Sequence, residues 1–205
     1  MIKLYGMPKT RSMRVVWALE EIGAEYRFIP VDLVTGEGRT PGFLALNPGG
    51  KVPVLVDGDL VLTESAAICT YLGDRFPESG LVPRCGTVER GLYDQWCYFV
   101  MTELEQPLWT IGKHKFALPK EKRVPEIKDT AIWEFQRAAA LLASGLGEKP
   151  YLLGDNFTMA DLLAAHTLAW ARSARISHNI DLLDDYRQRM MAREAFQRTL
   201  AVEKG

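Results

Sequence analysis

Two short apolar runs around a tight turn are the feature that most constrains how this chain folds. The runs are Val52 to Val56 and Leu60 to Leu62, and Asp57-Gly58-Asp59 separates them. This pattern predicts a β-hairpin, because glycine readily supplies the positive φ that a tight turn requires. Thr63-Glu64-Ser65 follows at once and opens an apolar helical run, Ala66 to Leu72. The hairpin is therefore expected to lead directly into the N-terminus of a helix.

The start of the first apolar run predicts a site for an extended peptide. Pro53 is its second residue, where a proline removes a hydrogen-bond donor from the sheet. A cis Val52–Pro53 bond would explain this, since it turns the Val52 main chain outward to pair with an extended ligand. Ser65, at the helix N-terminus, offers a hydroxyl and a backbone N–H to a carboxylate. A plain hairpin followed by an N-cap is the alternative that these residues leave open.

Four ordered stretches of the chain resemble the glutathione S-transferase family. They are LYGMPKTRSMRVVWALEE (Leu4 to Glu21), FLALNPGGKVPVL (Phe43 to Leu55), LTESAAICTYL (Leu62 to Leu72) and YLLGDNFTMADL (Tyr151 to Leu162). The resemblance implies an α/β thioredoxin-like N-terminal domain followed by an all-α helical C-terminal domain. We expect residues 1–77 to bind glutathione, residues 78–86 to form a linker, and residues 87–205 to contribute a hydrophobic substrate pocket. The resemblance also implies a cytosolic, bacterial-type homodimer that acts in detoxification.

The hydrophobic pattern predicts the same two parts. Strands are expected over Ile2–Tyr5 and Tyr26–Val31 around a helix over Ser12–Ile22, which is the βαβ unit that begins a thioredoxin-like sheet. After Phe76 no strand pattern follows, and helices are expected over residues 87–111, 121–146, 158–171 and, as shorter pieces, 182–200. Leu92 lies at apolar helical spacing in the first of these helices, and Leu141 is expected on the inward face of the second.

The resemblance assigns the backbone and the glutamyl end of glutathione to named positions. In the family the cysteinyl backbone pairs with the residue before the cis-proline, which is Val52 ahead of Pro53. The γ-glutamyl carboxylate lies on a Glu-Ser turn, which matches Glu64 and Ser65. Ser65 would donate its hydroxyl and its N–H, while Glu64 would pair with the glutamyl ammonium or orient a neighbouring donor.

Two cations are candidates for the glycyl carboxylate of glutathione. Lys51 lies just before Val52, where the family often keeps a cation, and Arg39 lies in the preceding loop. Both side chains would serve equally well as solvated surface charges, and the sequence does not separate these roles.

The loop from Gly6 to Arg11 is where the glutathione thiol would be activated. A free thiol of pKa ~8.5 is about 3% ionised at pH 7, and a pKa about two units lower raises that fraction to roughly 75%. One charge-assisted hydrogen bond and the positive end of a helix can supply this shift. Thr10 is the first choice for the hydroxyl and Ser12 the second, rather than Tyr5. Activation by backbone N–H groups alone, or a capping role for either hydroxyl, are the alternatives.

The chemistry expected of this loop is nucleophilic attack by glutathione itself on a small hydrophobic electrophile. No cysteine occupies the loop, which disfavours mixed-disulfide chemistry. Tyr98, Met101 and Trp109 are candidates for lining the apolar pocket of the electrophile. A glutathione-dependent peroxide or disulfide reductase or isomerase on the same fold is one alternative. A non-catalytic glutathione-binding or protein-interaction module is another.

Composition narrows the partners and the compartment. The formal net charge of −1 argues against nucleic acid or a membrane surface as the main partner. The three cysteines lack metal spacing and are odd in number, so neither a metal site nor a disulfide framework is expected and a reducing cytoplasm fits. The chain begins almost at once with an apolar strand pattern, without a signal-peptide pattern, and no apolar run is long enough to span a membrane.

One acidic residue is expected to be structural. Thr158-Met159-Ala160-Asp161 has the form of a helix capping box with aspartate in place of glutamate. Asp161 is therefore not expected to be a catalytic carboxylate.

Overall fold

The computed structural model describes residues 1–204, with side chains described to residue 202. The chain forms two compact units. The first contains Met1–Val82 and the C-terminal segment from Ala192 onward, and the second contains Pro83–Met191. These limits differ from the expected division chiefly at the C-terminus, where the last helix packs on the first helix of the chain.

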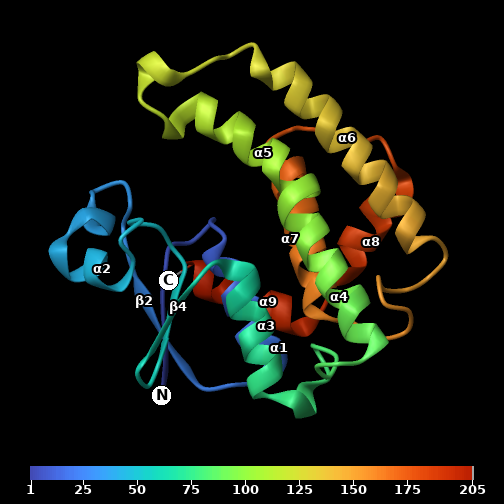
Figure 1. Ribbon diagram of the computed structural model, residues 1–205, viewed down its shortest axis with the longest axis horizontal. Helices are drawn as coiled ribbons and strands as arrows, with labels where there is room; N and C mark the ends of the chain where they lie inside the picture. The colour runs from blue at the N-terminus through green and yellow to red at the C-terminus, as the bar shows by residue number, and fades with distance from the viewer. Residues whose placement is uncertain (205) are drawn as a thin grey trace. The chain divides into compact units, whose positions relative to one another are not determined.

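The first unit is a four-stranded mixed sheet with helices on both faces. Its elements are β1 (Ile2–Gly6), α1 (Ser12–Ile22), β2 (Tyr26–Pro30), α2 (Pro41–Leu46), β3 (Val54–Asp57), β4 (Leu60–Thr63), α3 (Ser65–Arg75) and α9 (Glu194–Lys204), with short 3-10 turns at Glu37–Arg39 and Pro77–Ser79. The strand order is β2-β1-β3-β4, with β1 parallel to β2 and the other pairs antiparallel. Figure 1 shows α1 and α3 on one side of the sheet and α2 on the other. The expected α/β class of this part is confirmed.

The register of the sheet brings several loops to one end. Tyr5 of β1 pairs with Val54 of β3, and Val54 pairs in turn with Thr63 of β4. The loop after β1, the residues before β3 and the turn after β4 therefore meet at the same end of the sheet. Pro53 lies just before β3 and not within it, which corrects the expected strand start at Val52. A proline has no N–H to give to the ladder, so the strand begins after it.

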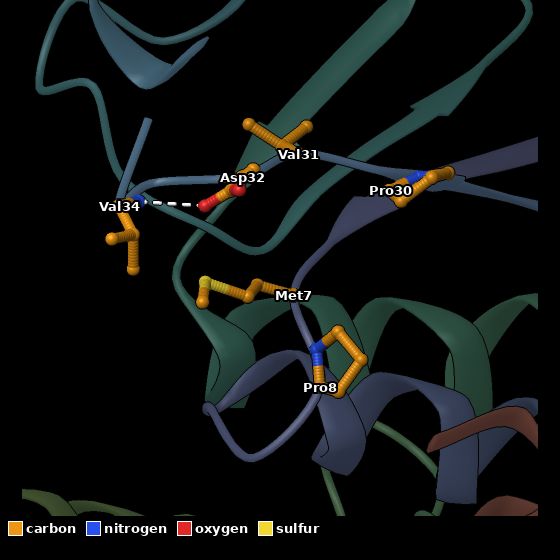
Figure 2. A pocket seen from close by; sticks show the side chains of 6 residues that line it. All are labelled: Met7, Pro8, Pro30, Val31, Asp32 and Val34. Carbon is orange, nitrogen blue, oxygen red and sulfur yellow. Dashed lines mark hydrogen bonds between the residues drawn. The ribbon is translucent and has the colours of Figure 1, made fainter. Parts of the chain in front are cut away.

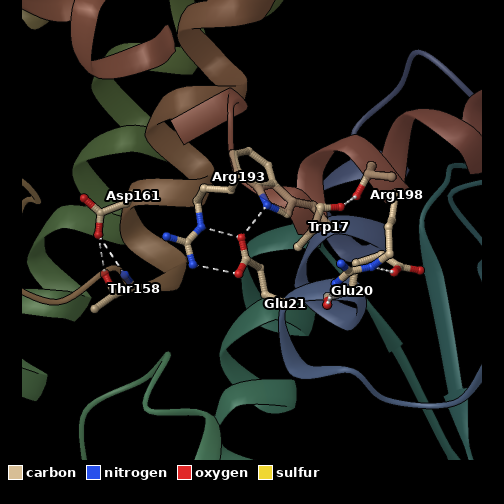
Figure 3. Close-up of polar contacts among 9 residues, drawn as sticks. Trp17, Glu20, Glu21, Thr158, Asp161, Arg193 and Arg198 are labelled. Atoms are coloured by element: carbon tan, nitrogen blue, oxygen red, sulfur yellow. Dashed lines mark hydrogen bonds and ion pairs between the residues drawn. The ribbon is translucent and has the colours of Figure 1, made fainter. Parts of the chain in front are cut away.

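Helix α9 is anchored to α1 by a buried aromatic contact and an ion pair. The Phe196 ring packs edge-on against the Trp17 indole, with 4.7 Å between ring centroids. Arg193 donates two hydrogen bonds to the Glu21 carboxylate, at 2.6 and 2.8 Å, and Figure 3 shows this fork. These contacts join the end of the chain to the helix that follows the loop Gly6 to Arg11.

The regular elements of the second unit are helices, as expected, and one isolated β-bridge joins Tyr151 to Gly154. The unit contains α4 (Val88–Phe99), α5 (Glu105–Gly112), α6 (Ile127–Leu146), α7 (Met159–Ser173) and α8 (Asp181–Met191), with π-helical turns at Val100–Leu104 and Lys113–Ala117 and a 3-10 turn at Lys120–Lys122. Pro107 cannot donate to the carbonyl four residues earlier, which explains the wider π turn just before it. Helix α6 begins later than expected because Pro125 disfavours helical backbone at the residue before it.

Two leucines of this unit are exposed although both lie at apolar helical spacing. Leu92 is 47% exposed and Leu141 is 59% exposed, so the inward assignment of Leu141 is wrong. The close contact between α4 and α6 is made by a different pair. A Cβ on Gly145 would approach the Trp96 ring to 2.2 Å, so only glycine fits there. Among residues 1–204, no helix is both long and apolar enough to cross a membrane.

Asp161 caps α7 from a fully buried position, and the predicted capping box is present. One carboxylate oxygen accepts the Thr158 N–H and hydroxyl, each at 2.9 Å, as Figure 3 shows. The other oxygen accepts the Leu152 N–H and the Tyr186 hydroxyl, each at 2.8 Å. Burial raises the pKa of Asp161, while these four donors oppose that shift. Asp161 therefore ties α7 to the preceding turn and to α8.

Candidate functional site

The main chain before β3 lies at the end of the sheet where the loops meet. The Val52–Pro53 peptide bond is cis. Pro53 is buried, while Val52 is partly buried and packs its side chain against a small apolar cluster that contains Val54 and Phe43. Within residues 1–204, neither the Val52 N–H nor its carbonyl is engaged in a hydrogen bond. The Val52 main chain is thus available to pair with a ligand.

The turn from β4 into α3 carries Glu64 and Ser65. Glu64 adopts φ 66° and ψ 110°, a conformation that costs a non-glycine residue free energy and that clusters at functional sites. Its side chain is exposed and makes no cap bond. Ser65 is the first residue of α3 and is 2% exposed, so it is not the N-cap. The free N–H groups of the first helical turn and one buried hydroxyl are therefore presented together.

The two candidate cations come from loops that touch each other. A Cβ built on Gly50 would lie 2.6 Å from the Gly38 carbonyl oxygen and 3.0 Å from an Arg39 guanidinium nitrogen. Gly50 has φ +61°, so glycine suits both the close approach and the conformation. The structure therefore places the Arg39 guanidinium against Gly50, the residue before Lys51. Both side chains are exposed.

Thr10 and Ser12 form a hydrogen-bonded pair beneath the β1–α1 loop. Their hydroxyl oxygens are 2.9 Å apart, and Thr10 Oγ1 also lies 2.6 Å from the Met7 carbonyl oxygen. The Thr10 oxygen accepts the Ser12 N–H, and the Ser12 oxygen accepts the Met7 N–H, each at 3.2 Å. Thr10 is partly exposed, whereas Ser12 has no exposed surface. Of the two hydroxyls, the one at position 10 is the more accessible.

Tyr5 is directed elsewhere. Its ring lies 6.4 Å from the Phe43 ring, in the apolar cluster between the sheet and α2. It also lines a pocket of about 460 Å³ with residues of β2 and α2. That Tyr5 is not the donor to the thiol stays a prediction.

A small apolar pocket borders the same loop. It has a volume of about 310 Å³ and is lined by Met7, Pro8, Pro30, Val31, Asp32 and Val34. Figure 2 shows the Met7 side chain extending between the loop and the segment that follows β2. Met7 also supplies the carbonyl that lies 2.6 Å from the Thr10 hydroxyl oxygen, so the pocket and the hydroxyl pair share this residue. No sequence pattern indicated this pocket, since its walls come from two loops without periodicity.

The three expected pocket residues of the helical part lie along one helical stretch of the second unit. Tyr98 belongs to α4 and is 70% exposed, Met101 lies in the first π-helical turn, and Trp109 belongs to α5. The Trp109 ring contacts the Phe116 ring edge-on, with 6.5 Å between centroids. Their role as pocket residues stays a prediction.

One residue at the site was missed by the sequence analysis. Arg14 lies in the first turn of α1, is fully buried, and donates a hydrogen bond from its guanidinium to Ser65 Oγ at 3.3 Å. The available signal was a charged residue inside an otherwise apolar helical run, Met13 to Leu19. A charge at such a position needs polar partners, and one of them here is a predicted ligand-binding residue.

Within the described part of the chain, no group of three or more His, Cys, Asp or Glu side chains is placed to hold a metal ion. Cys69, Cys85 and Cys97 form no disulfide bond. Burial raises the pKa of Cys97 to about 12, so this thiol is not ionised near neutral pH.

Comparisons with known proteins agree with this geometry. Family models described as the N-terminal and the C-terminal domain of glutathione S-transferase match residues 1–74 and 126–188. Glutathione S-transferase 3 of Zea mays is 33% identical over 98% of this chain and 93% of its own length. Glutathione S-transferase F9 of Arabidopsis thaliana is 34% identical over 78% of this chain and 76% of its own.

Solved structures extend the likeness to the whole fold. A glutathione transferase from Methylococcus capsulatus is 32% identical and superposes with a TM-score of 0.88, over 100% of this chain and 99% of its own. A glutathione transferase homologue from Sulfitobacter, solved with bound glutathione, is 25% identical with a TM-score of 0.85, over 98% and 97% of the two chains. The chain belongs to the glutathione S-transferase family, and it is an enzyme of that type.

Proposed function

We propose that this protein binds glutathione at the end of the sheet where β1, β3 and β4 meet, and transfers its thiolate to a small hydrophobic electrophile. The observation that carries the proposal is the available main chain of Val52 beside the N-terminus of α3. The backbone of a tripeptide can pair with the Val52 main chain, and its carboxylate can bind the N-terminus of α3. The Sulfitobacter homologue with bound glutathione has the same fold.

Each group of glutathione has a counterpart in this proposal. The cysteinyl backbone pairs with Val52, which Pro53 holds in place, and the γ-glutamyl carboxylate binds the Ser65 hydroxyl and N–H. Glu64 is exposed and pairs with the glutamyl ammonium. The glycyl carboxylate meets Lys51 and Arg39, whose loops touch at Gly38 and Gly50.

Thr10 is the proposed donor to the thiolate. A hydroxyl carries one proton, so Thr10 would turn that proton from the Met7 carbonyl to the sulfur when glutathione binds. Ser12 then acts from behind, because its buried hydroxyl holds the Thr10 oxygen and the Met7 N–H in place. The start of α1 adds a favourable field for the anion.

The electrophile is proposed to enter beside this loop. The pocket formed with Met7, Pro8 and Val34 is mostly apolar, and Met7 also contacts the Thr10 hydroxyl, so the pocket suits a small hydrophobic group. Tyr98, Met101 and Trp109 stay candidates for further contacts. A panel of aryl halides, epoxides and peroxides assayed with glutathione separates a conjugating enzyme from a peroxide reductase, and activity toward none of them would favour a binding module.

We propose a homodimer in the cytoplasm. Leu92, Trp133 and Leu141 expose large apolar side chains on α4 and α6, and a second copy would cover such surface. Cys69, Cys85 and Cys97 form no disulfide bond, which fits a reducing compartment. The mass of the protein measured by light scattering would test the dimer, and a monomer at micromolar concentration would contradict it.

Ser65→Ala is expected to weaken glutathione binding by about 1–2 kcal/mol, the scale of a hydrogen bond to a charged group. Isothermal titration calorimetry with glutathione measures this directly. Ser79→Ala is the matched control, because that hydroxyl donates only to the Phe76 carbonyl in the same unit. Equal affinity of the Ser65 variant and the control would remove Ser65 from the carboxylate site.

A further inference from the structure

Arg14, in the first turn of α1, is bonded to the first two turns of α3. Its guanidinium donates to Ser65 Oγ at 3.3 Å, and its main-chain carbonyl accepts the Cys69 thiol, with 3.8 Å between sulfur and oxygen. Cys69 lies one helical turn after Ser65, so the two contacts fix successive turns of the same helix face. Arg14 has no exposed surface. Its side chain is therefore held from within the protein, directly behind the N-terminus of α3.

This contact determines which way the Ser65 hydroxyl can act. A guanidinium only donates and stays protonated, so Ser65 Oγ is the acceptor in this bond. The hydroxyl proton then remains for another acceptor. In the described part of the chain it has none, since the bond from Arg14 is the sole side-chain hydrogen bond of Ser65. The buried cation thus orients Ser65 as a donor toward an outside anion.

The same guanidinium contributes charge as well as orientation. A positive charge that is excluded from water is screened less than a surface charge, so its field extends to the helix end. The N-terminus of α3 adds partial positive charge at the same point. An anion that accepts the Ser65 proton would therefore meet three favourable contributions: the hydrogen bond from Ser65, the charge of Arg14 and the field of the α3 N-terminus. Arg14 supplies its charge directly and acts on the hydrogen bond through Ser65.

We propose that Arg14 is the positioning residue for the γ-glutamyl carboxylate of glutathione, acting through Ser65 and not by contact with the ligand. This inference rests on the proposed function, because it assumes that the carboxylate binds at Ser65. It differs from a purely structural role, which would support the fold around both helices without favouring any one group of the ligand.

The experiment compares two ligands in several variants. Glutathione and an analogue that lacks only the γ-glutamyl α-carboxylate are titrated calorimetrically into the wild type, Arg14→Met and Arg14→Lys. The wild type should bind glutathione about tenfold or more tightly than the analogue, as expected for a hydrogen bond to a charged group. In Arg14→Met, most of this ratio of glutathione affinity to analogue affinity should be lost, while the affinity for the analogue changes little. In a Ser65→Ala background, Arg14→Met should change the ratio much less, because the two residues act as one unit.

A ratio that stays at the wild-type value in Arg14→Met, with both ligands weakened equally, would overturn the positioning role and leave the carboxylate site intact. If the wild type does not distinguish the two ligands, the carboxylate does not bind at Ser65, and both the inference and that part of the proposed function fail. Should the methionine variant not fold, Arg14→Lys decides the question. A lysine keeps the charge but cannot keep the guanidinium geometry, so we expect a ratio between those of wild type and Ser65→Ala. An unchanged ratio would count against the proposal.

Discussion

Thr10→Ala is expected to slow conjugation at pH 7 by up to about 25-fold, the limit at which the pKa returns fully to ~8.5 and the ionised fraction of bound thiol falls from roughly 75% to about 3%. The field of the α1 N-terminus remains in this variant and keeps the loss below that limit. Glutathione affinity should stay close to the wild-type value, since Thr10 contacts none of the anchoring groups. The deficit should also disappear near pH ~9.5, where a thiol with either pKa is mostly ionised. A pH–rate profile of both proteins with one electrophile measures all three effects.

The control for this change is Thr10→Ser, which keeps the hydroxyl and its bond to the Met7 carbonyl. It should retain most of the wild-type rate at neutral pH. A deficit for Thr10→Ala that persists unchanged at high pH would mean that the loop has lost its shape and not its donor. If Thr10→Ala shows no deficit at any pH, Thr10 is not the donor to the thiolate, and Ser12 or backbone N–H groups take that role instead.

Asp161→Ala is expected to lower the free energy of unfolding by about 3–5 kcal/mol. The substitution leaves four buried donors without an acceptor. Each unsatisfied donor costs about 1–3 kcal/mol, and the total is smaller than the sum because such losses are not fully additive. Denaturant unfolding followed by circular dichroism measures the change. The exposed Asp155→Ala in the preceding turn is the control, with an expected change below about 0.5 kcal/mol.

The rate per folded molecule of the Asp161 variant should remain near that of the wild type. All four groups that bind this carboxylate belong to the second unit, and each has a capping or tethering role. Wild-type stability of Asp161→Ala combined with lost turnover would instead make Asp161 a catalytic residue and contradict the structural assignment.

Local patterns were enough to predict most elements of the fold. The alternation in β1 and β2, the hairpin turn and the capping box at Thr158 are each encoded within a few residues, so periodicity and turn chemistry identify them. The burial of individual helical residues was less predictable. Leu92 and Leu141 match a helical apolar spacing yet are exposed, because spacing defines a stripe and not what covers it.

In the candidate site, too, some residues could be predicted from local sequence and others could not. Val52, Glu64 and Ser65 follow one another around a hairpin, so sequence spacing could place them together. Arg14 reaches Ser65 across 51 positions of sequence, and the apolar pocket combines loops after β1 and β2. Long-range contacts of this kind depend on packing, which a single sequence does not specify. The position of α9 on α1, through Arg193 and Glu21, was missed for the same reason.

The central claim is that this site ionises the thiol of glutathione, and titration of bound glutathione measures that property without any choice of electrophile. The ultraviolet absorbance of the thiolate, followed against pH at saturating protein, should give a pKa about two units below the ~8.5 of a free thiol. A bound thiol that titrates no lower than free glutathione would contradict the account, and would leave the protein a binder of glutathione rather than a transferase.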